Sequence, residues 1–269
     1  VEMKALTQSV LAAAMLVALP FAAAEACTKN AWNGNTSAAA GAVAAGPQTG
    51  QRSYEGLCSL RTTAGQFVTD NTPAAEGTYS ARFYVYTGGS GKVFSATTAN
   101  DNGGTEVVGV SYNGSAFTFS GATAVSPIAA APNAWYSVSF TNVSGGAFSV
   151  SVQGNGVAAA TTGSGTAAAG TVESASLGFI GAGSGTFDTD AFESRRTSAL
   201  IPRLCRGDTN GDSARNITDA IRVRNQFVSG GASPAGGQAD YSEDGNVNIT
   251  DAIQIRNVFV SGQSACPAV

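Results

Sequence analysis

The stretch DTNGDSARNITDAIRVRNQF (residues 208–227) returns in altered form as DYSEDGNVNITDAIQIRNVF (residues 240–259). The second copy begins 32 residues after the first, and both contain the core NITDAI. Only 12% of the residues are charged, yet both copies carry Asp at their first, fifth and twelfth positions. Asp, Asn and Gly are ordinary turn formers. Two copies with matched spacing indicate instead that the spaced oxygen atoms act together.

The spacing predicts a pair of calcium loops. Ca²⁺ takes six to eight oxygen ligands, and a twelve-residue loop supplies them from positions 1, 3, 5, 7, 9 and 12, with a backbone carbonyl at position 7. In the first copy these positions are Asp208, Asn210, Asp212, Ala214, Asn216 and Asp219. In the second copy they are Asp240, Ser242, Asp244, Asn246, Asn248 and Asp251. We therefore expect two calcium ions as cofactors.

Each loop is followed by a segment with helical periodicity that ends at a glycine. The expected buried faces are Ala220, Val223 and Phe227 in the first copy and Ala252, Ile255 and Phe259 in the second. The residues before the first loop, PRLCRG, are too short and broken for an entering helix. The unit is thus a loop with an exit helix. With so small a core, metal binding should contribute folding free energy.

The segments GDTNGDSARNITDAIRVRNQF and EDGNVNITDAIQIRN resemble the duplicated calcium segment of type I dockerins. The resemblance covers Arg206 to about Gly262. Dockerins attach secreted enzymes and binding proteins to cohesin-bearing scaffolds, so it implies two antiparallel helices folded by calcium and a cohesin-like or other extracellular partner. The contact residues that it implies are Ile217, Thr218, Arg224, Asn225, Ile249, Thr250, Arg256 and Asn257.

Two of these contact positions depart from the common dockerin pattern. Ile-Thr stands in each loop where Ser-Thr is frequent, and Arg-Asn stands in each helix where Lys-Arg is common. The departures put ordinary cohesin specificity in doubt. The near identity of the copies still implies that a partner can dock in two orientations.

The middle of the chain is predicted to be a β-sandwich. TYSARFYVYT (residues 78–87) alternates, with Tyr79 and Phe83 on one face and Tyr84 and Tyr86 on the other. Further alternating runs are joined by Asn113-Gly114 and by Gly145-Gly146, which are hairpin turns. The fold class is therefore mainly β, a two-sheet antiparallel jelly-roll sandwich with a small C-terminal α domain of two calcium loop–helix repeats.

Residues 50–196 resemble the concanavalin A-like or laminin-G-like sandwiches of secreted bacterial proteins, through TYSARFYVY, AWYSVSF, FSVSVQGNG and FDTDAFESRR. That resemblance implies a glycan-binding, adhesive or glycosidase module. We expect the sandwich domain over 27–199 and the dockerin-like domain over 200–269. Sugar rings could stack on exposed aromatic side chains. The candidates are Tyr84, Tyr86, Tyr112, Trp135 and Tyr136.

The N-terminus predicts export. Lys4 precedes the apolar run from Val10 to Ala23, and small residues allow cleavage after Ala24 or Ala26, so residues 1–26 are an expected signal peptide. A lipoprotein with Cys27 as anchor is the less favoured alternative. We expect the mature protein to be secreted or bound to a bacterial cell surface, with no membrane span once the signal is removed.

All four cysteines follow the expected signal, and an oxidising compartment favours disulfides. Cys27–Cys58 and Cys205–Cys266 would each close one region, although sequence order does not prove this pairing. Zinc is a poor alternative because the chain has no His and no CxxC.

Composition also limits the function. A net charge of −4 and the lack of a basic patch argue against nucleic acid as a partner. Because His is absent, His-based triads are excluded. The sequence thus favours a non-catalytic, secreted calcium-binding protein that docks through its dockerin-like module. Its sandwich would bind a glycan or surface ligand in polysaccharide utilisation or adhesion.

The alternative is a dockerin-bearing glycoside hydrolase. It would act on a polysaccharide through Asp188, Asp190 and Glu193, which loosely resemble a paired-acid strand.

Overall fold

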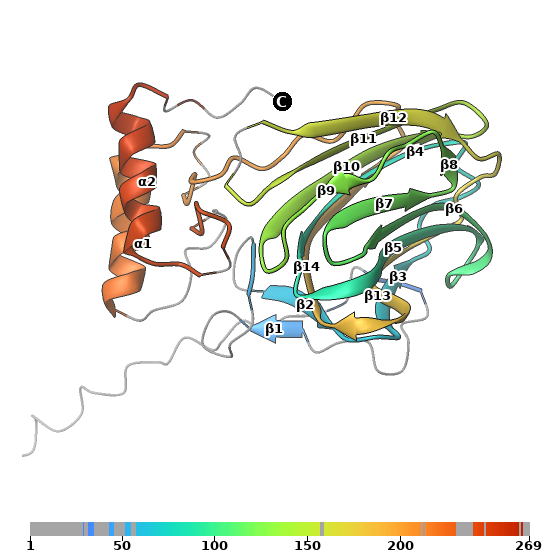
Figure 1. Cartoon of the computed structure of the whole chain (residues 1–269), viewed down its shortest axis with the longest axis horizontal. Coiled ribbons are helices and arrows are strands. Elements are labelled where there is room, and N and C mark those ends of the chain that lie inside the picture. Colours follow the sequence, from blue (N-terminus) through green and yellow to red (C-terminus); the bar gives the residue numbers. More distant parts are fainter. Residues whose placement is uncertain are drawn as a thin grey trace, which may run out of the picture.

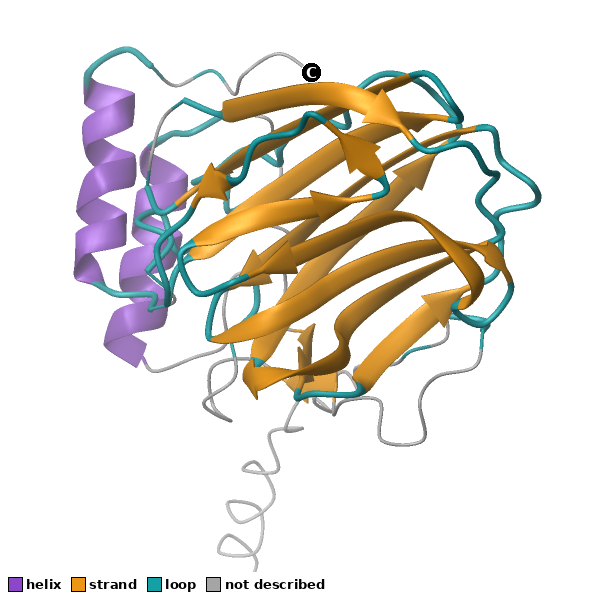
Figure 2. Ribbon diagram, turned by 45° about the vertical axis from the view of Figure 1, so that its right-hand side comes forward, coloured by secondary structure: helices purple, strands orange, loops and turns teal. Residues whose placement is uncertain are grey.

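The computed structural model describes residues 29, 32–34, 43–45, 52–54, 58–156, 159–210, 212, 214–229, 239–244, 246–263 and 265. The expected signal peptide and Cys27 lie outside these residues. The described chain forms two antiparallel sheets packed as a sandwich, with two helices at one end of it (Figures 1 and 2). This confirms the predicted fold class.

The larger sheet has eight strands. In spatial order they are β1 (Val43–Ala45), β2 (Cys58–Thr62), β14 (Phe187–Arg195), β4 (Thr78–Tyr86), β10 (Trp135–Val143), β11 (Ala147–Gly154), β12 (Thr161–Ala167) and β8 (Ala122–Thr123). Its two longest-paired central strands, β4 and β10, match residue for residue from Trp135 opposite Tyr86 to Val143 opposite Thr78. This register fixes which side chains share a face.

The smaller sheet has six strands. In spatial order they are β3 (Gln66–Asp70), β13 (Ser174–Gly185), β5 (Gly89–Ala99), β6 (Gly103–Tyr112), β7 (Ala116–Ser120) and β9 (Ile128–Ala129). β5 and β13 are irregularly paired, with register shifts along their length. Such bulges increase the twist that lets a sheet curve over its partner.

The core lies between the sheets and follows the predicted alternation. Tyr79 and Phe83 on β4 are wholly buried in it. The phenyl ring of Phe94, on β5 of the smaller sheet, lies 5.5 Å from that of Phe83 and 5.2 Å from that of Phe140 on β10. Aromatic rings from both sheets thus interdigitate, which is the packing that joins the two layers.

Both predicted hairpins form, with one shifted by a residue. β10 and β11 are joined by a turn containing Gly145, whose φ of 64° favours glycine. Between β6 and β7, the Asn113 N–H donates to the Ala116 carbonyl at 3.1 Å, so the two loop residues are Gly114-Ser115. Asn113 lies just before these two loop residues, and its side chain accepts the N–H of Ser115.

The two predicted exit helices are α1 (Ile217–Ser229) and α2 (Ile249–Val260). Arg215, just before α1, donates to the carbonyls of Gln263 and Ala265, just after α2, so the packed helices run antiparallel. Within the described ranges, neither of the two helices combines the length and apolar character that a membrane span requires.

The predicted helix faces are only partly correct. Ala220, Val223, Ala252 and Ile255 are buried and form a small core with Ala239. Phe227 and Phe259, expected on the same faces, are 51% and 40% exposed. Counted from Val223, Gln226 at i+3 lies about as close to the buried face of α1 as Phe227 at i+4. The structure buries Gln226 and leaves Phe227 exposed.

Candidate calcium loops and docking face

Backbone N–H groups orient the carboxylates at the first and fifth positions in the same way in both loops. In the first loop the Asp212 N–H donates to Asp208 Oδ1 at 3.1 Å, and the Ala214 N–H donates to Asp212 Oδ1 at 2.9 Å. The second loop repeats both bonds at 3.2 and 2.8 Å between the residues at the same positions. The matched sequences therefore give matched loop geometry.

The acids at the twelfth position, Asp219 and Asp251, lie in the first turns of α1 and α2 and are wholly buried. Oδ2 of each accepts the N–H of the residue at position 9, Asn216 or Asn248, at 2.8 Å. The Asn side chain in turn accepts the N–H two residues later at 2.7 Å. This reciprocal capping ties the loop to the start of its helix.

The side chains at the third position also bond within the loops. The Asn210 amide donates to Asp212 Oδ2 at 2.8 Å and lowers the pKa of Asp212. In the second loop the Ser242 hydroxyl lies 3.2 Å from Asp240 Oδ1 and donates to it. The predicted oxygen ligands of each loop are therefore brought into one compact turn.

These residues fit a hard cation. None of the ion pairs among the described residues involves Asp219 or Asp251, although both carboxylates are buried. Burial raises the pKa of Asp251. A buried carboxylate is costly unless it is paired, and a Ca²⁺ ion would supply the missing positive charge.

Carboxylates alone would not complete such a site. No three acidic, His or Cys side chains of the described chain gather tightly enough to hold a metal ion. The sequence pattern assigns the remaining ligands to Asn, Ser and carbonyl oxygens.

The two helices form an apolar groove of about 220 Å³ with matched walls. Its lining residues come in pairs from equivalent positions of the two copies: Ile217 and Ile249, Ala220 and Ala252, Ile221 and Ile253, and Arg224 and Arg256. The four isoleucines are 41–44% exposed, which is unusual for a side chain of this type. The groove therefore presents a symmetric apolar surface with a cation at each side.

All eight residues that the resemblance implied as contacts are exposed. In both copies the arginine of the helix donates from Nη2 to Oδ1 of the following asparagine at 2.8 Å. This bond holds Arg224 and Arg256 in the same arrangement beside the groove. Four of the eight, Ile217, Arg224, Ile249 and Arg256, line the groove, and the other four are their neighbours in sequence.

The acids of the hydrolase alternative lie on one face of β14, the outer face of the eight-stranded sheet. Asp188 pairs with Tyr86 and Asp190 with Tyr84 on β4. A bulge after Asp190 then places Glu193 opposite Arg82, on the same face. The sequence alone would have put Glu193 on the opposite face by simple alternation.

Each of these acids is held by other groups. Asp188 is 1% exposed and forms an ion pair with Arg61. Asp190 accepts the N–H of Tyr54 at 2.6 Å. Glu193 pairs with Arg82 and with Arg195 at 3.1 and 2.7 Å. These contacts do not favour a nucleophile with a neighbouring acid/base.

The aromatic side chains predicted as exposed sugar platforms are buried, so that prediction was wrong. Tyr112 and Tyr136 lie in the core between the sheets. Tyr84, Tyr86 and Trp135 are on the outer face of the eight-stranded sheet, where residues 52–54 and 201–206 cover them. Alternation predicts which face of the sheet each residue lies on, but it does not predict that residues 52–54 and 201–206 cover the outer face.

Both described cysteines, Cys58 and Cys205, are disulfide-bonded. Cys27 and Cys266 lie outside the described residues, so the two pairings stay predictions.

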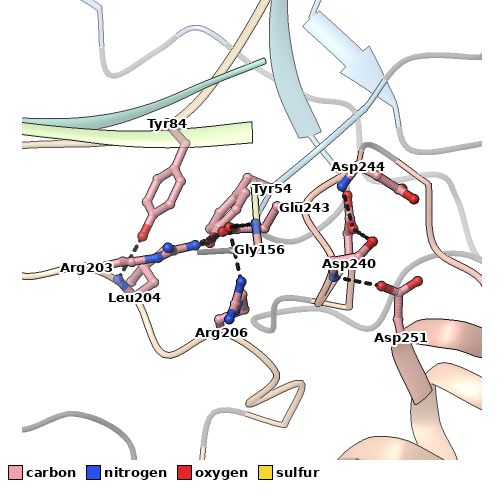
Figure 3. A network of polar contacts seen from close by, with 11 residues as sticks. Tyr54, Tyr84, Gly156, Arg203, Leu204, Arg206, Asp240, Glu243, Asp244 and Asp251 are labelled. Atoms are coloured by element: carbon pink, nitrogen blue, oxygen red, sulfur yellow. Dashed lines mark hydrogen bonds and ion pairs between the residues drawn. The ribbon is translucent and has the colours of Figure 1, made fainter. Parts of the chain in front are cut away.

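One contact between the second loop and the sandwich was missed altogether. Glu243, at the fourth position of the second loop, is buried against the sandwich (Figure 3). Its neighbours in the loop gave no indication of this, since an acid between two ligands is expected to face solvent.

Residues 206–259 match the profile of the dockerin type I domain. With the fold described above, the chain is a β-sandwich followed by a dockerin-like module. No curated protein matches the chain.

Three solved structures resemble part of the chain. The botulinum neurotoxin type G receptor binding domain is 10% identical over 59% of this chain and 43% of its own, with a TM-score of 0.35. The binding domain of botulinum neurotoxin DC in complex with SialylT is 11% identical over 60% and 42%, with a TM-score of 0.36. The Trypanosoma rangeli sialidase with the inhibitor DANA is 16% identical over 53% and 26%, with a TM-score of 0.37. This chain spans less than half the length of each.

Proposed function

We propose that this protein is an exported, non-catalytic, two-domain protein that docks to a cohesin-like extracellular partner. The β-sandwich over 27–199 would be the cargo, and the module over 200–269 would bind two calcium ions and the partner. The match of residues 206–259 to the dockerin type I domain supports this assignment. The observation that carries it is the paired isoleucine groove, which leaves a large apolar surface uncovered.

The two calcium ions would be held by the two sets of ligands predicted from the repeat. Their role is to fix the loops and, through the capped acids Asp219 and Asp251, the starts of both helices. The groove is built from these helix starts, since Ile217 and Ile249 are their first residues. Calcium would therefore determine whether the docking surface exists.

A partner would cover the isoleucines and meet Arg224 and Arg256 at the sides. The groove calls for an apolar surface flanked by acceptors or carboxylates. The Thr218 and Thr250 hydroxyls at the helix starts add polar contacts at both ends. Because equivalent residues line both walls, the partner could bind in either of two orientations that exchange the two copies.

For the sandwich we propose binding of a glycan or surface ligand, in polysaccharide utilisation or adhesion. Hydrolysis is not favoured, because Asp188 is buried in an ion pair with Arg61. Retention on insoluble polysaccharides without release of reducing sugar would support the binding role. Reducing-sugar release that is lost in Glu193→Gln would overturn it.

The docking proposal is tested with the full chain and a panel of purified cohesin domains, in calcium and in EDTA. We expect binding in calcium only. The double variant Ile221→Glu/Ile253→Glu should abolish it, because two carboxylates would enter the apolar groove. Val228→Glu is the control, because Val228 is 74% exposed and is not among the residues that line the groove. Equal binding by both variants would contradict the assignment of this surface.

A further inference from the structure

Glu243 joins the second calcium loop to the sandwich. It stands between the predicted ligands Ser242 and Asp244, but its side chain points away from the loop toward the sandwich (Figure 3). It is wholly buried, and its φ is 60°, a conformation that side-chain-bearing residues adopt only under constraint. A buried acid with a strained backbone needs strong compensating contacts.

Those contacts come from three side chains. The Tyr54 hydroxyl donates to Glu243 Oε1 at 2.7 Å, and Arg203 forms an ion pair with the same oxygen. Arg206 Nη1 lies 3.3 Å from Oε2. Tyr54 belongs to a segment that lies on the sandwich, while both arginines precede the first calcium loop. One carboxylate thus holds together parts of the chain that are far apart in sequence.

Two backbone groups of the sandwich complete the contact. The Gly156 N–H, just after β11, donates to Glu243 Oε2 at 3.2 Å. The Trp135 N–H, at the start of β10, donates to the Glu243 carbonyl at 2.9 Å. A Cβ atom at Gly156 would lie 3.2 Å from the Ser242 carbonyl, so the second loop approaches this turn closely.

The same contact covers aromatic side chains on the outer face of the eight-stranded sheet. The Tyr54 ring stacks on Tyr84 with 3.7 Å between centroids and meets Trp135 edge-on at 5.5 Å. The Leu204 N–H donates to the Tyr84 hydroxyl at 2.8 Å. Apolar burial therefore adds to the charged contacts in holding the second loop on the sandwich.

The first loop has no equivalent of this anchor. Its fourth position is Gly211, which has no side chain. The dockerin-like module is nearly symmetric on its groove side but asymmetric on its sandwich side. Only the second copy can be held in this way, which fixes the orientation of the module relative to the sandwich.

We infer that Glu243 is an interdomain clasp that couples calcium binding at the second loop to docking of that loop on the sandwich. The clasp and the ligands Ser242 and Asp244 share one backbone segment, so the loop conformation that suits calcium is also the one that presents Glu243. Coupling of this kind is reciprocal, since each event stabilises the other by the same factor. The inference rests on the proposed calcium binding, but it does not depend on the docking partner.

The first test is a calcium titration of the full chain by calorimetry. In Glu243→Ala we expect one of two sites to weaken by about 10-fold or more, within the usual range of coupling between sites, and the other to be unchanged. Glu193→Gln is the matched control, because it also removes a carboxylate that contacts arginines on the outer face of the sheet. Wild-type affinities at both sites in Glu243→Ala would overturn the inference.

The second test follows hydrogen exchange of the segment that begins at Trp135, in the full chain. Calcium should protect it in the wild type. Asp244→Ala should remove that protection, whereas Asp212→Ala, at the same position of the first loop, should not. Equal loss in both variants would overturn the coupling. A chain that docks to no cohesin but shows these differences would contradict the proposed function and leave the clasp standing.

Discussion

Arg61 and Asp188 form a bidentate ion pair across neighbouring strands of the larger sheet. Nε of Arg61 lies 2.6 Å from Oδ1 of Asp188, and Nη2 lies 2.8 Å from Oδ2. The two residues face each other in the pairing of β2 with β14. Asp188 is 1% exposed, so this arginine is what makes its burial tolerable.

Replacing Arg61 by Met should therefore destabilise the sandwich strongly. Removing one partner of a buried pair leaves an uncompensated charge, which costs about 3–5 kcal/mol. Because Arg61 is 26% exposed, we expect the lower end of that range. Urea unfolding at pH 7 measures it. The control Arg195→Met breaks an exposed pair, which should change the free energy of unfolding by about 1 kcal/mol or less. Equal losses in the two variants would contradict the buried-pair argument.

Glu106 on β6 provides an acid-sensitive contact in the smaller sheet. Burial by itself would raise its pKa, but bonds from Lys92, Ser120 and Ser95 outweigh that effect and lower the pKa. The Lys92 Nζ lies 2.6 Å from Oε2 of Glu106. A carboxyl whose pKa is lower in the folded than in the unfolded state stabilises the fold above its unfolded pKa.

Glu106→Gln should accordingly cost about 1 kcal/mol at neutral pH, the scale of a partly exposed hydrogen bond to a charged group. The difference between wild type and variant should disappear as the pH falls through the folded pKa of Glu106. Urea unfolding at a series of pH values between 7 and 3, with EDTA present throughout, measures it. A difference that stays constant down to pH 3 would mean that Glu106 contributes through its shape and not through its charge.

Local sequence patterns predicted the features that depend on local physics. Alternation placed Tyr79 and Phe83 in the core and Tyr84 on the opposite face, because neighbouring side chains of a strand point to opposite sides. The spacing of oxygen-bearing residues likewise predicted the loops, since their hydrogen bonds join residues close in sequence.

Features that depend on distant residues were missed or misjudged. The bulge after Asp190 moves Glu193 to the face of Asp188, and no local sequence pattern predicts this bulge. The buried state of Trp135 depends on Tyr54 and on the second calcium loop, both remote in sequence. The contact of Glu243 was missed because its partners Arg203 and Tyr54 are brought to it only by the fold.

Calcium removal should unfold the dockerin-like module before the sandwich. Its core consists of a few small or medium side chains around Val223 and Ile255, too few to offset the ordering of the chain. Calcium at 100 times its dissociation constant would add about 2.7 kcal/mol for each site. With the cysteines reduced, EDTA should therefore lower the helical signal in circular dichroism while the β signal remains.

Repeating the measurement with the cysteines oxidised separates the contribution of calcium from that of the disulfides. A bond at Cys205 should restore part of the helical signal, because cross-linking stabilises mainly by restricting the unfolded chain. Identical helical signals with and without calcium in the reduced protein would contradict the role of the metal in folding.

The paired groove makes a last prediction about how the partner binds. If a partner can approach in two orientations that exchange the copies, Ile221 and Ile253 exchange places in the shared groove between them. Ile221→Glu and Ile253→Glu should then lower cohesin affinity to the same extent, because each places one carboxylate at an equivalent point of the groove. The double variant should lose binding altogether, because two carboxylates then enter the groove. Titration calorimetry with the full chain in calcium measures all three. Unequal losses in the two single variants would show that the partner uses one orientation, and the clasp at Glu243 would then be the feature that breaks the symmetry of the copies.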